Sequence, residues 1–336
     1  MSIKNAIKEV HEGLHLDSFR AEALFDAIFE GGVSDVTLAA ILVAMKIRRE
    51  QPEEIIGAVR SMRKYAVNPG LDDHTVFDTC GTGGDNSFSF NISTAVAIIL
   101  NTMGYSIAKH GNRSVSSKSG SADFLEALDI PINLTGEEAR KYFDNNNFLF
   151  MFAPSYHPAM KNAVPVRKEL GVRTIFNFLG PLTNPSQPAR QMTGVFHPDV
   201  LPLYARAAAE LSFEKIVLYS SSNGMDEVSP LHPTHVYEID DRRISTFTID
   251  PSCYIRQQEA LSIPVDCTAG ENAGLFMETV TSGTHTSLGK LLALNTALAL
   301  YTLGHNDSID SNYHDALDAI HGGDVHNRIS MLRQER

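Results

Sequence analysis

The sequence predicts an α/β protein in which a small N-terminal helical domain precedes a larger α/β domain with a central, mostly parallel sheet. Two observations predict this class. Residues 1–69 show helical patterns only, whereas from residue 75 onward strand patterns alternate with loops and helical patterns. With 336 residues, the chain is also long enough to form two domains.

Helix start signals divide the N-terminal region. Ser18 is placed to cap one helix, and Ser34 or Asp35 is placed to start the next. Pro52, followed by two glutamates, is typical of a third helix start, and we expect that helix to end near Tyr65. We assign residues 1–69 to the helical domain, which part of the helical stretch 157–180 is expected to complete. Residues 70–336 are assigned to the α/β domain.

The rest of the chain alternates strands and helices. We expect strands at 76–80, 106–108, 148–152, 215–219, 235–239 and 244–249. We expect helices at 91–103, 122–128 and 288–303. Ligands of open α/β sheets collect at the carboxyl ends of the strands, so the loops that follow the strands are the places to look for a site.

Composition and charge disfavour several classes of partner. The formal charge of −12 and the isoelectric point of about 5.5 argue against a nucleic-acid-binding surface, because such surfaces are usually basic. The three cysteines lack metal-binding spacing and fit a reducing compartment. No apolar signal core or membrane-length apolar run is present. We expect a cytoplasmic protein that binds small molecules, without nucleic-acid or membrane partners.

A glycine loop, Gly81-Thr82-Gly83-Gly84-Asp85, follows the first expected strand. Its glycines allow a ligand to approach backbone N–H groups, and Asn91-Ile92-Ser93-Thr94 starts the next helix with three polar side chains. The loop is not a Walker A sequence, because no Gly-Lys-Ser/Thr follows, and the G-x-G-x-x-G spacing of dinucleotide sites fails. Taken alone, it favours a structural turn.

The stretch Lys109–Asp123 is the second candidate ligand loop, and it is almost free of apolar residues. It contains two Lys, one Arg, five Ser and two Gly. Lys109 and Arg113 provide charge-assisted hydrogen bonds to phosphate, which are about twice as strong as neutral ones. Because both loops follow adjacent strand–loop–helix units, they predict a site for a ligand with several phosphates.

Asp226 and Glu227 form the third candidate element, after the strand expected at 215–219. Adjacent carboxylates at the carboxyl end of a strand suit Mg²⁺, a hard cation that prefers oxygen ligands. Other chemistry-bearing residues are interpreted as structural: Asp240-Asp241, the pair His232 and His235, and Cys80.

Six motifs occur in order along the chain: Gly81-Thr82-Gly83-Gly84-Asp85, Asn91-Ile92-Ser93-Thr94, the Lys109–Asp123 stretch, Gly171-Val172-Arg173-Thr174-Ile175-Phe176-Asn177, Gly180-Pro181-Leu182-Thr183-Asn184-Pro185 and Asp226-Glu227. Together they closely resemble the anthranilate phosphoribosyltransferase family over essentially the whole chain. The resemblance implies the nucleoside phosphorylase class III type of fold, with a helical domain hinged to an α/β domain, and a homodimer formed through the helical domain. It also implies a Mg²⁺-dependent transfer from 5-phosphoribosyl 1-pyrophosphate (PRPP) to anthranilate in tryptophan biosynthesis.

The resemblance also implies roles for individual residues. It places PRPP against Gly81, Gly84, Asp85, Ser89, Asn91, Ile92, Ser93, Thr94, Lys109, His110, Gly111, Asn112, Arg113, Ser114, Val115, Ser116, Ser117 and Ser121. It places Mg²⁺ against Ser93, Asp226 and Glu227, and anthranilate against Gly81, Asn112 and Arg167. His110 and residues 154–158 match the channel that admits the aromatic acid. Phe124 and Asp129 depart from the family, which more often has an aliphatic residue and a glycine there.

The chemistry implied needs no strong general base, because an arylamine is neutral near pH 7 and attacks without first losing a proton. Lys109 and Arg113 would neutralise the departing pyrophosphate, and Arg167 would pair with the carboxylate of anthranilate. Without the resemblance, Arg167 would be interpreted as an exposed helix arginine. His110 either shuttles the amine proton after attack or has a packing and hydrogen-bonding role.

Three alternatives remain. A pyrimidine nucleoside phosphorylase of the same fold is disfavoured by Asp226 and Glu227. A non-catalytic homologue that binds nucleic acid is disfavoured by the acidic charge and the intact loops. A conventional type I phosphoribosyltransferase would need a Thr/Gly-rich loop after paired acids, and Asp240-Asp241 lacks that loop.

Overall fold

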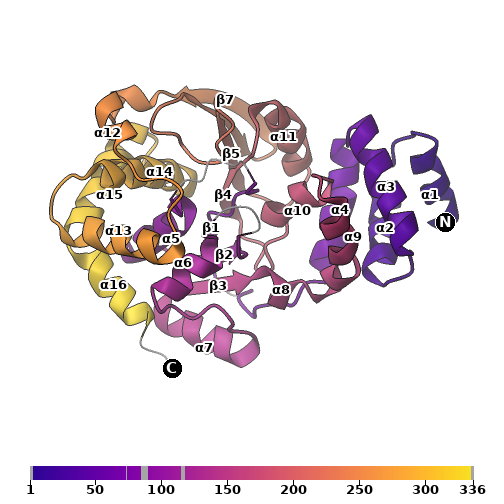
Figure 1. Cartoon of the computed structure of the whole chain (residues 1–336), viewed down its shortest axis with the longest axis horizontal. Helices are drawn as coiled ribbons and strands as arrows, with labels where there is room; N and C mark the ends of the chain where they lie inside the picture. Colours follow the sequence, from indigo (N-terminus) through magenta and orange to yellow (C-terminus); the bar gives the residue numbers. More distant parts are fainter. Residues whose placement is uncertain (1–2, 73, 85–89, 115–117, 334–336) are drawn as a thin grey trace.

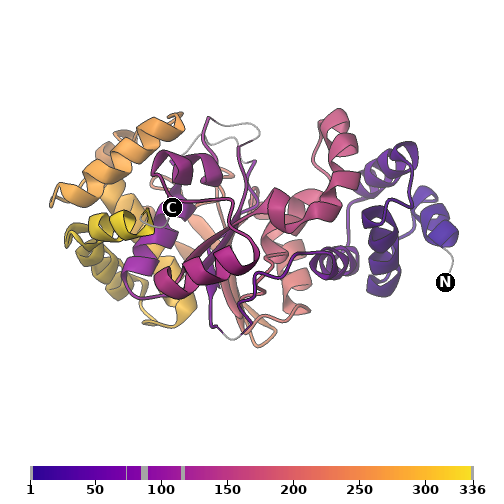
Figure 2. The same cartoon turned by 90° about the horizontal axis from the view of Figure 1, so that it is seen from below.

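The structure is a computed structural model that describes residues 3–72, 74–84, 90–114 and 118–333. Figures 1 and 2 show an elongated molecule with the N-terminal helices at one end, the C-terminal helices at the other and the sheet between them. The predicted fold class is confirmed, because a small helical domain precedes an α/β domain with a mostly parallel sheet.

The N-terminal region is helical, as predicted. Its helices are α1 (Ile3–His11), α2 (Ser18–Phe29), α3 (Asp35–Arg48) and α4 (Pro52–Lys64). The cap predicted at Ser18 is wrong by one residue: Asp17 caps α2 and accepts from the Arg20 N–H at 2.8 Å. Ser34 caps α3 as expected, and Pro52 is the first residue of α4.

A buried carboxylate, Glu54, joins three parts of the helical domain. It accepts hydrogen bonds from the backbone N–H groups of Leu16 and Gln51, both at 3.0 Å, and it pairs with the Arg48 guanidinium at 2.5 Å. A buried charge is tolerated only when its lone pairs are satisfied, and all of these donors converge on one side chain. Glu54 thereby fixes the angle at which α3 passes into α4.

The sheet has seven strands in the order β3-β2-β1-β4-β5-β6-β7. They are β1 (Phe77–Asp78), β2 (Ile107–Gly111), β3 (Phe148–Phe152), β4 (Arg190–Gly194), β5 (Lys215–Ser221), β6 (Thr234–Asp240) and β7 (Arg243–Ile249). The strands from β3 to β5 in that order pair in parallel, and β6 and β7 add an antiparallel edge.

Strand β4 is the element that the sequence patterns miss. It lies in the middle of the sheet, yet it carries polar residues where an apolar run would be expected. Gln191 and Thr193 are both fully buried, and the Gln191 amide donates to the Thr193 hydroxyl at 2.8 Å and to the Pro181 carbonyl at 2.7 Å. Because the Gln191 amide has hydrogen-bond acceptors inside the protein, the strand tolerates the burial of these polar residues without an apolar pattern.

A second difference concerns Lys109 and His110, which the sequence places in a polar loop. Both belong to β2 and are buried, so the expected strand at 106–108 is too short. The pairing of β2 with β3 runs from Ile107 opposite Phe148 to Gly111 opposite Phe152. The polar loop therefore begins at Asn112, and Lys109 is a core residue rather than a surface cation.

Helices cover both faces of the sheet. On the C-terminal side of Figure 1 lie α5 (Ile92–Thr102), α6 (Ser121–Ala127), α7 (Gly136–Asn146), α12 (Gln257–Leu261), α13 (Ala269–Thr281), α14 (Ser287–Leu303), α15 (Ile309–His321) and α16 (Asp324–Leu332). Toward the helical domain lie α8 (Ala153–Tyr156), α9 (Val164–Leu170), α10 (Phe176–Leu182) and α11 (Leu201–Ala209). Short 3-10 turns are η1 (Pro158–Asn162), η2 (Pro198–Val200) and η3 (Pro251–Cys253).

The sheet separates two hydrophobic cores. Successive residues of β5 alternate between them: Val217 and Tyr219 face one core, and Ile216 and Leu218 face the other. The second core is shared with the helical domain, since α9 packs on α3, and α10 and α11 pack on α4. The proposed division at residues 69 and 70 stays a prediction, because the core itself runs across it.

The two departures from the family pattern have local explanations. Asp129 adopts a positive φ of 59°, a conformation in which glycine is less strained. Phe124 is fully buried, and its ring packs edge-on against Phe90 with centroids 5.6 Å apart and at a tilt against Phe276 at 5.7 Å. This aromatic cluster sits under the start of the polar loop's helix, α6.

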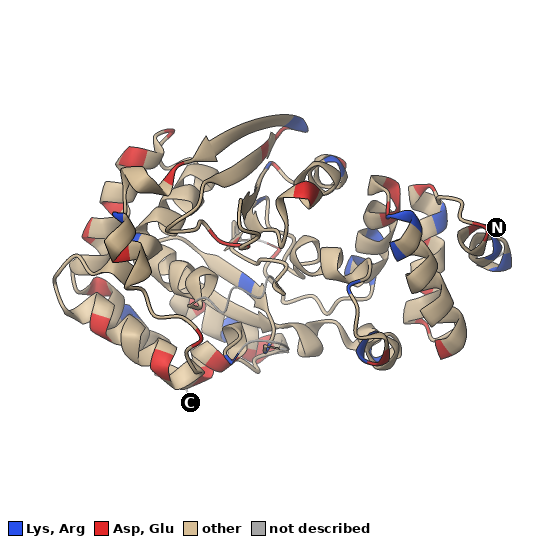
Figure 3. Cartoon of the chain, turned by 45° about the horizontal axis from the view of Figure 1, so that its top comes forward, with Lys and Arg blue, Asp and Glu red and all other residues tan. Residues whose placement is uncertain are grey.

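Charged residues are dispersed over the molecule. In the view of Figure 3, acidic residues are spread over the outer helices of the larger domain, and basic residues occur among them rather than in one cluster. None of the described helices combines the length and the apolar character needed to cross a membrane.

Candidate active site

The candidate residues gather at the carboxyl edge of the parallel strands. The glycine loop follows β1, Asn112 follows β2, Val195 follows β4, and the segment with Asp226 follows β5. Because these strands are parallel neighbours, their following loops meet at one edge, as the sequence predicts. Within the predicted set, Asp85, Ser89, Val115, Ser116 and Ser117 lie outside the described residues.

The described part of the glycine loop is held by backbone contacts with its neighbours. The Thr82 N–H donates to the Gly194 carbonyl at 2.9 Å, and the Gly83 N–H donates to Asp226 Oδ2 at 2.7 Å. Gly83 and Gly84 have φ values of 65° and 74°, which favour glycine. The loop is thus a formed turn whose shape depends on Asp226.

Asp226 approaches β4 very closely. A Cβ added to Gly194 would lie 1.7 Å from the Asp226 carbonyl oxygen, and one added to Gly81 would lie 3.0 Å from Asp226 Oδ2. Glycine is required at Gly194 because only a residue without a side chain leaves room for that carbonyl. Gly81 belongs to the glycine motif of the sequence, whereas the need for glycine at position 194 follows only from the packing.

Glu227 contacts the start of α5. Its Oε1 accepts from the Ser93 N–H at 3.1 Å, and its Oε2 accepts from the Tyr219 hydroxyl at 3.2 Å. The carboxylate is nearly buried, and a negative group at a helix N-terminus is favoured by the helix dipole. Ser93 and the acidic segment, which the resemblance assigns to one site, are therefore in contact in the structure.

Lys109 reaches the same cluster from inside the sheet. Its ammonium contacts Ser93 Oγ and Thr79 Oγ1, both at 3.3 Å, and the Thr79 carbonyl at 3.4 Å. Asp78, which is fully buried, lies nearby; burial raises its pKa to about 6, although Lys109 opposes that rise. A buried lysine near a buried aspartate supplies positive charge at the sheet edge without exposing it to solvent.

Asp78 also ties the sheet edge to the segment after α10. One carboxylate oxygen accepts from the His110 N–H at 3.3 Å, and the other accepts from the Asn184 amide at 2.7 Å. The same Asn184 amide donates to the Ala108 carbonyl at 2.9 Å. Asn184 lies in a recognised motif, but the role of Asp78 and Tyr219 was not predicted, because neither belongs to a pattern that indicates ligand binding.

Arg113 is already paired within the protein. Its guanidinium forms a two-pronged ion pair with Glu126, at 2.5 and 2.7 Å, and contacts Asp123 at 2.8 Å. The hydrogen bonds that the guanidinium donates to both carboxylates raise its pKa further. Arg113 therefore does not contact the Asp226 cluster in this structure, and a phosphate would have to replace these carboxylates to bind it.

Asn91 likewise uses its side chain to join segments. Its Oδ1 accepts from the Ser119 hydroxyl at 2.6 Å and from the Asn272 amide at 2.9 Å, and its amide donates to the Ser119 carbonyl at 3.2 Å. The polar loop is thereby fastened to the start of α5 and to α13. Ile92 and Thr94 are fully buried in the first turn of α5.

The predicted residues for the aromatic acid are not brought together in one contact network. Arg167 lies on α9 with its guanidinium 5.1 Å from the Phe176 ring centroid, and burial lowers its pKa. The Asn112 side chain accepts from the Arg113 N–H at 2.7 Å. Arg167 is thus a half-buried, stacked cation rather than the freely exposed helix arginine that the residue pattern alone would favour.

His110 and His157 form a buried pair. Their rings are arranged edge to face with centroids 5.0 Å apart, and His110 Nδ1 is 3.1 Å from the Gly180 carbonyl. A carbonyl only accepts, so Nδ1 carries the proton and Nε2 is the bare nitrogen. Burial lowers the pKa of His157 to about 4 and that of His110 well below its usual value, and both rings are neutral near pH 7.

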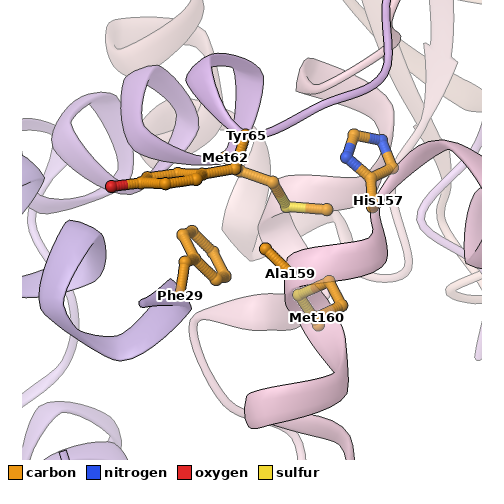
Figure 4. Close-up of a pocket in the computed structure, with 6 residues that line it drawn as sticks. All are labelled: Phe29, Met62, Tyr65, His157, Ala159 and Met160. Carbon is orange, nitrogen blue, oxygen red and sulfur yellow. The ribbon is translucent and has the colours of Figure 1, made fainter. Parts of the chain in front are cut away.

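Figure 4 shows His157 at one end of a small pocket between the helical domain and η1. The other lining residues are Phe29, Met62, Tyr65, Ala159 and Met160. Its empty volume is about 140 Å³, well below the roughly 300–1,000 Å³ of typical ligand pockets. The pocket adjoins the segment 154–158, but in this form it is too small to be the binding site of an aromatic acid.

The acidic cluster fits a hard cation. Asp226, Glu227 and the Ser93 hydroxyl offer oxygen atoms only, which are the ligands that a hard cation prefers, and a carboxylate has about four acceptor positions on its two oxygens. Within residues 3–72, 74–84, 90–114 and 118–333, no group of three or more His, Cys, Asp and Glu side chains comes together as a metal site. Any cation here would therefore be held by few protein ligands and share its remaining positions with ligand oxygens and water, as Mg²⁺ commonly does.

The features interpreted as structural lie outside this chemistry. Cys80 is buried, and burial raises the pKa of its thiol, so it is not a poised nucleophile. His235 Nε2 is paired with the Ser222 hydroxyl at 3.1 Å, and His232 is exposed. Asp240 and Asp241 lie at the turn between β6 and β7.

Comparison with known proteins gives a consistent result. Two family profiles match the chain: the helical bundle domain of a glycosyl transferase family at residues 4–66, and the a/b domain of a glycosyl transferase family at residues 73–326. The anthranilate phosphoribosyltransferase of Metallosphaera sedula is 42% identical, covering 90% of this chain and 88% of that protein. The enzyme of the same name from Brevibacillus brevis is 39% identical, covering 98% and 96%.

Solved structures agree with these sequence matches. Anthranilate phosphoribosyltransferase from Thermus thermophilus superposes with a TM-score of 0.86 at 32% identity, covering 98% of this chain and 99% of that one. The Saccharomyces cerevisiae enzyme in complex with PRPP and Mg has a TM-score of 0.86 at 25% identity, covering 98% and 96%.

The buried His157 predicts a specific pH dependence of stability. Its folded pKa of about 4 lies below the value of 6.5 for an unperturbed histidine, so between these pH values the unfolded chain binds more protons than the native one. The free energy of unfolding that depends on neutral His157 is fully present above about pH 6.5 and is lost as the pH falls toward 4. When measured by chemical unfolding, the free energy of unfolding of wild type should fall across this window by about 2–3 kcal/mol more than that of His157→Gln.

The matched control is His232→Gln, which changes an exposed histidine. This variant should keep the wild-type pH dependence. If His157→Gln and wild type lose stability in parallel between pH 6.5 and 4, the buried neutral state assigned to His157 is wrong.

Proposed function

The chain belongs to the anthranilate phosphoribosyltransferase family, and on that premise we propose how its residues carry out the reaction. The protein is a glycosyltransferase of the pentosyltransferase kind. It transfers the 5-phosphoribosyl group of PRPP to the amine of anthranilate and releases pyrophosphate, a step of tryptophan biosynthesis. The observation that carries this assignment is the match over nearly the whole chain, whose matched region includes the loops at the sheet edge.

We propose that PRPP binds along the carboxyl edge of β1 and β2. The support is the formed glycine loop, the N-terminus of α5 and the buried ammonium of Lys109, which together present N–H groups and positive charge to one region. Because the protein as a whole is acidic, local donors have to supply the attraction for a polyphosphate. Arg113 is proposed to exchange Glu126 and Asp123 for a phosphate when PRPP arrives.

We propose that Ser93, Asp226 and Glu227 hold Mg²⁺ together with the substrate. The support is their all-oxygen donor set and the yeast relative that was solved with PRPP and Mg. A bound Mg²⁺ supplies neutralisation of the negative charge that develops on the departing pyrophosphate. The protein's own contribution is to fix both carboxylates, Asp226 through the Gly83 N–H and Glu227 through the Ser93 N–H and the Tyr219 hydroxyl.

We propose that Arg167 orients anthranilate through its carboxylate. In the reaction the bond between the ribosyl carbon and pyrophosphate breaks, the bond between that carbon and the amine nitrogen forms, and the nitrogen then loses a proton. The arylamine is uncharged, so alignment and stabilisation of the leaving group carry the catalysis. The Phe176 ring supports this role, because it fixes the Arg167 guanidinium by stacking.

Of the two roles that the sequence leaves open for His110, this proposal favours hydrogen bonding. Its Nδ1–H is committed to the Gly180 carbonyl, and its Nε2 has no hydrogen-bond partner among the residues that the structure describes. With a pKa held low by burial, His110 is a neutral acceptor and a weak base at neutral pH. We propose that it receives a hydrogen bond from the aromatic substrate or its amine rather than a full proton.

We further propose a homodimer formed through the helical domain and a cytoplasmic location. The helical domain exposes large apolar side chains at Leu14, Phe19, Val36 and Ile47, of which Phe19 is 77% exposed and Val36 is 83% exposed. Large exposed apolar side chains in so small a domain favour an interface. The three cysteines are free, which fits a reducing compartment.

The function is tested by following the fluorescence of anthranilate. Because its amine nitrogen is part of the fluorescent aromatic system, the signal should fall when the protein, PRPP and Mg²⁺ are present together. It should remain constant when PRPP is left out or when a chelator removes Mg²⁺. A folded preparation that leaves the complete mixture unchanged would refute the assignment.

Substitution of the two carboxylates tests the metal proposal. Asp226→Asn and Glu227→Gln keep the shapes of the side chains but remove the charge that attracts Mg²⁺. Each variant should need a Mg²⁺ concentration at least about tenfold higher for half-maximal turnover, since one weakened ion contact costs about 1.4 kcal/mol or more. Asp241→Asn is the matched control at the β6–β7 turn and should titrate like wild type. An unchanged Mg²⁺ titration in both site variants would remove them from the metal site.

Substitution of Arg167 tests the anthranilate proposal. Loss of a charge-assisted hydrogen bond typically costs about 1.5–3 kcal/mol, so Arg167→Ala should raise the KM for anthranilate about tenfold or more and leave the KM for PRPP nearly unchanged. Lys168→Ala, an exposed neighbour on α9, is the control and should change neither constant. Equal increases of both KM values in Arg167→Ala would contradict the assigned role.

A further inference from the structure

The connector between α9 and α10 touches the helical domain. Arg173 lies in this connector, and its backbone carbonyl accepts a hydrogen bond from the Lys46 ammonium at 2.9 Å. Lys46 lies near the end of α3, which packs on α9. The main chain at Arg173 is therefore held by a side chain of the helical domain.

The side chain of the same residue reaches the glycine loop. The Arg173 guanidinium donates a hydrogen bond to the Gly84 carbonyl and lies over the Phe196 ring, 4.2 Å from its centroid. Stacking on an aromatic face restricts the orientation of a guanidinium and leaves its N–H edge free to donate. Arg173 thus joins Lys46 on one side to Gly84 on the other.

Phe196 connects the stack to the same loop a second time. Its backbone N–H donates to Thr82 Oγ1 at 3.0 Å, two residues before Gly84. The glycine loop is consequently held by Asp226 from one direction and by Arg173 and Phe196 from another. The second of these contacts leads, through Arg173 and Lys46, to the helical domain.

We propose that Arg173 is a positioning residue that couples the helical domain to the phosphate-binding glycine loop. The proposal rests on the assigned function and extends it to a residue outside the set proposed to bind substrate. A phosphate-binding loop must present N–H groups to the anion and turn its carbonyls away, because a carbonyl oxygen repels phosphate. By holding the Gly84 carbonyl, Arg173 keeps that oxygen out of the site, and Lys46 keeps Arg173 in place.

The coupling also relates the two substrates. Arg167, proposed to bind anthranilate, lies on α9, the helix that precedes the connector. Gly84, proposed to bind PRPP, accepts a hydrogen bond from the Arg173 side chain. A shift of α9 against α3 would be transmitted through Arg173 to the loop. Through this chain of contacts the helical domain affects PRPP binding, although the Lys46 side chain is itself exposed to solvent.

The experiment compares Lys46→Ala, Lys46→Arg, Arg173→Ala and the double alanine variant in the intact protein. Lys46→Ala should raise the KM for PRPP about three- to tenfold, in the range expected for a coupling contact outside a site. Lys46→Arg retains a donor and should restore the wild-type value. Arg173→Ala should raise the KM at least as much, and adding Lys46→Ala to it should produce no further increase, because Lys46 acts through Arg173.

Hydrogen exchange and a matched control separate the possible outcomes. In the free protein, Lys46→Ala should speed exchange of the backbone amides of residues 81–84, whereas Lys4→Ala, an exposed lysine on α1, should alter neither exchange nor KM. An unchanged KM for PRPP with unchanged exchange in Lys46→Ala, or additive effects in the double variant, overturns the coupling. Absence of turnover in the wild type contradicts the assigned function instead, and the exchange measurement still decides the coupling.

Discussion

The close approach of Asp226 to the end of β4 is the constraint on which the site depends. The backbone at Asp226 passes so near to Gly194 that no side chain fits there, and the Asp226 carboxylate then accepts the Gly83 N–H. One segment therefore sets the distance between the loop after β5 and the loop after β1. A larger residue at the end of β4 would push the Asp226 segment away from β4 and so away from the glycine loop.

Charge is arranged by the same packing. The protein carries a formal charge of −12, yet the sheet edge contains a buried ammonium, Lys109, placed among hydroxyl groups and near the buried Asp78. A buried cation is weakly screened, so it acts strongly on an anion that comes within a few ångströms. Arg113, by contrast, is exposed and paired with Glu126. The two cations grouped together in the sequence therefore differ in kind: one is fixed in the interior, and the other is available only by exchanging partners.

Much of this arrangement could be predicted from the sequence, because motif residues that follow parallel strands must meet at one edge. The glycine loop, Ser93 and the acidic pair were placed correctly for that reason. Lys109 was assigned to a loop because its polarity hid the strand, and β4 was missed because its buried Gln191 and Thr193 are polar and break the apolar pattern expected of a central strand. The pairing of Arg113 and the link through Arg173 depend on contacts between distant segments, which no local pattern indicates.

The two proposed substrate sites rest on different cores, so the fold has to keep these cores in a fixed position relative to each other. The glycine loop and Lys109 belong to the sheet edge, whereas Arg167 belongs to α9, which packs with the helical domain. Two direct fastenings join them near the chemistry: the Gly180 carbonyl of α10 accepts from His110 of β2, and Asn184 binds Asp78 of β1. The Arg173 connector joins α9 to α10. Because α9 packs on the helical domain and α10 is bonded to the sheet, the chain is held on both sides of that connector. The separation of the two proposed substrate sites is thus determined by packing between the cores, not by either loop alone.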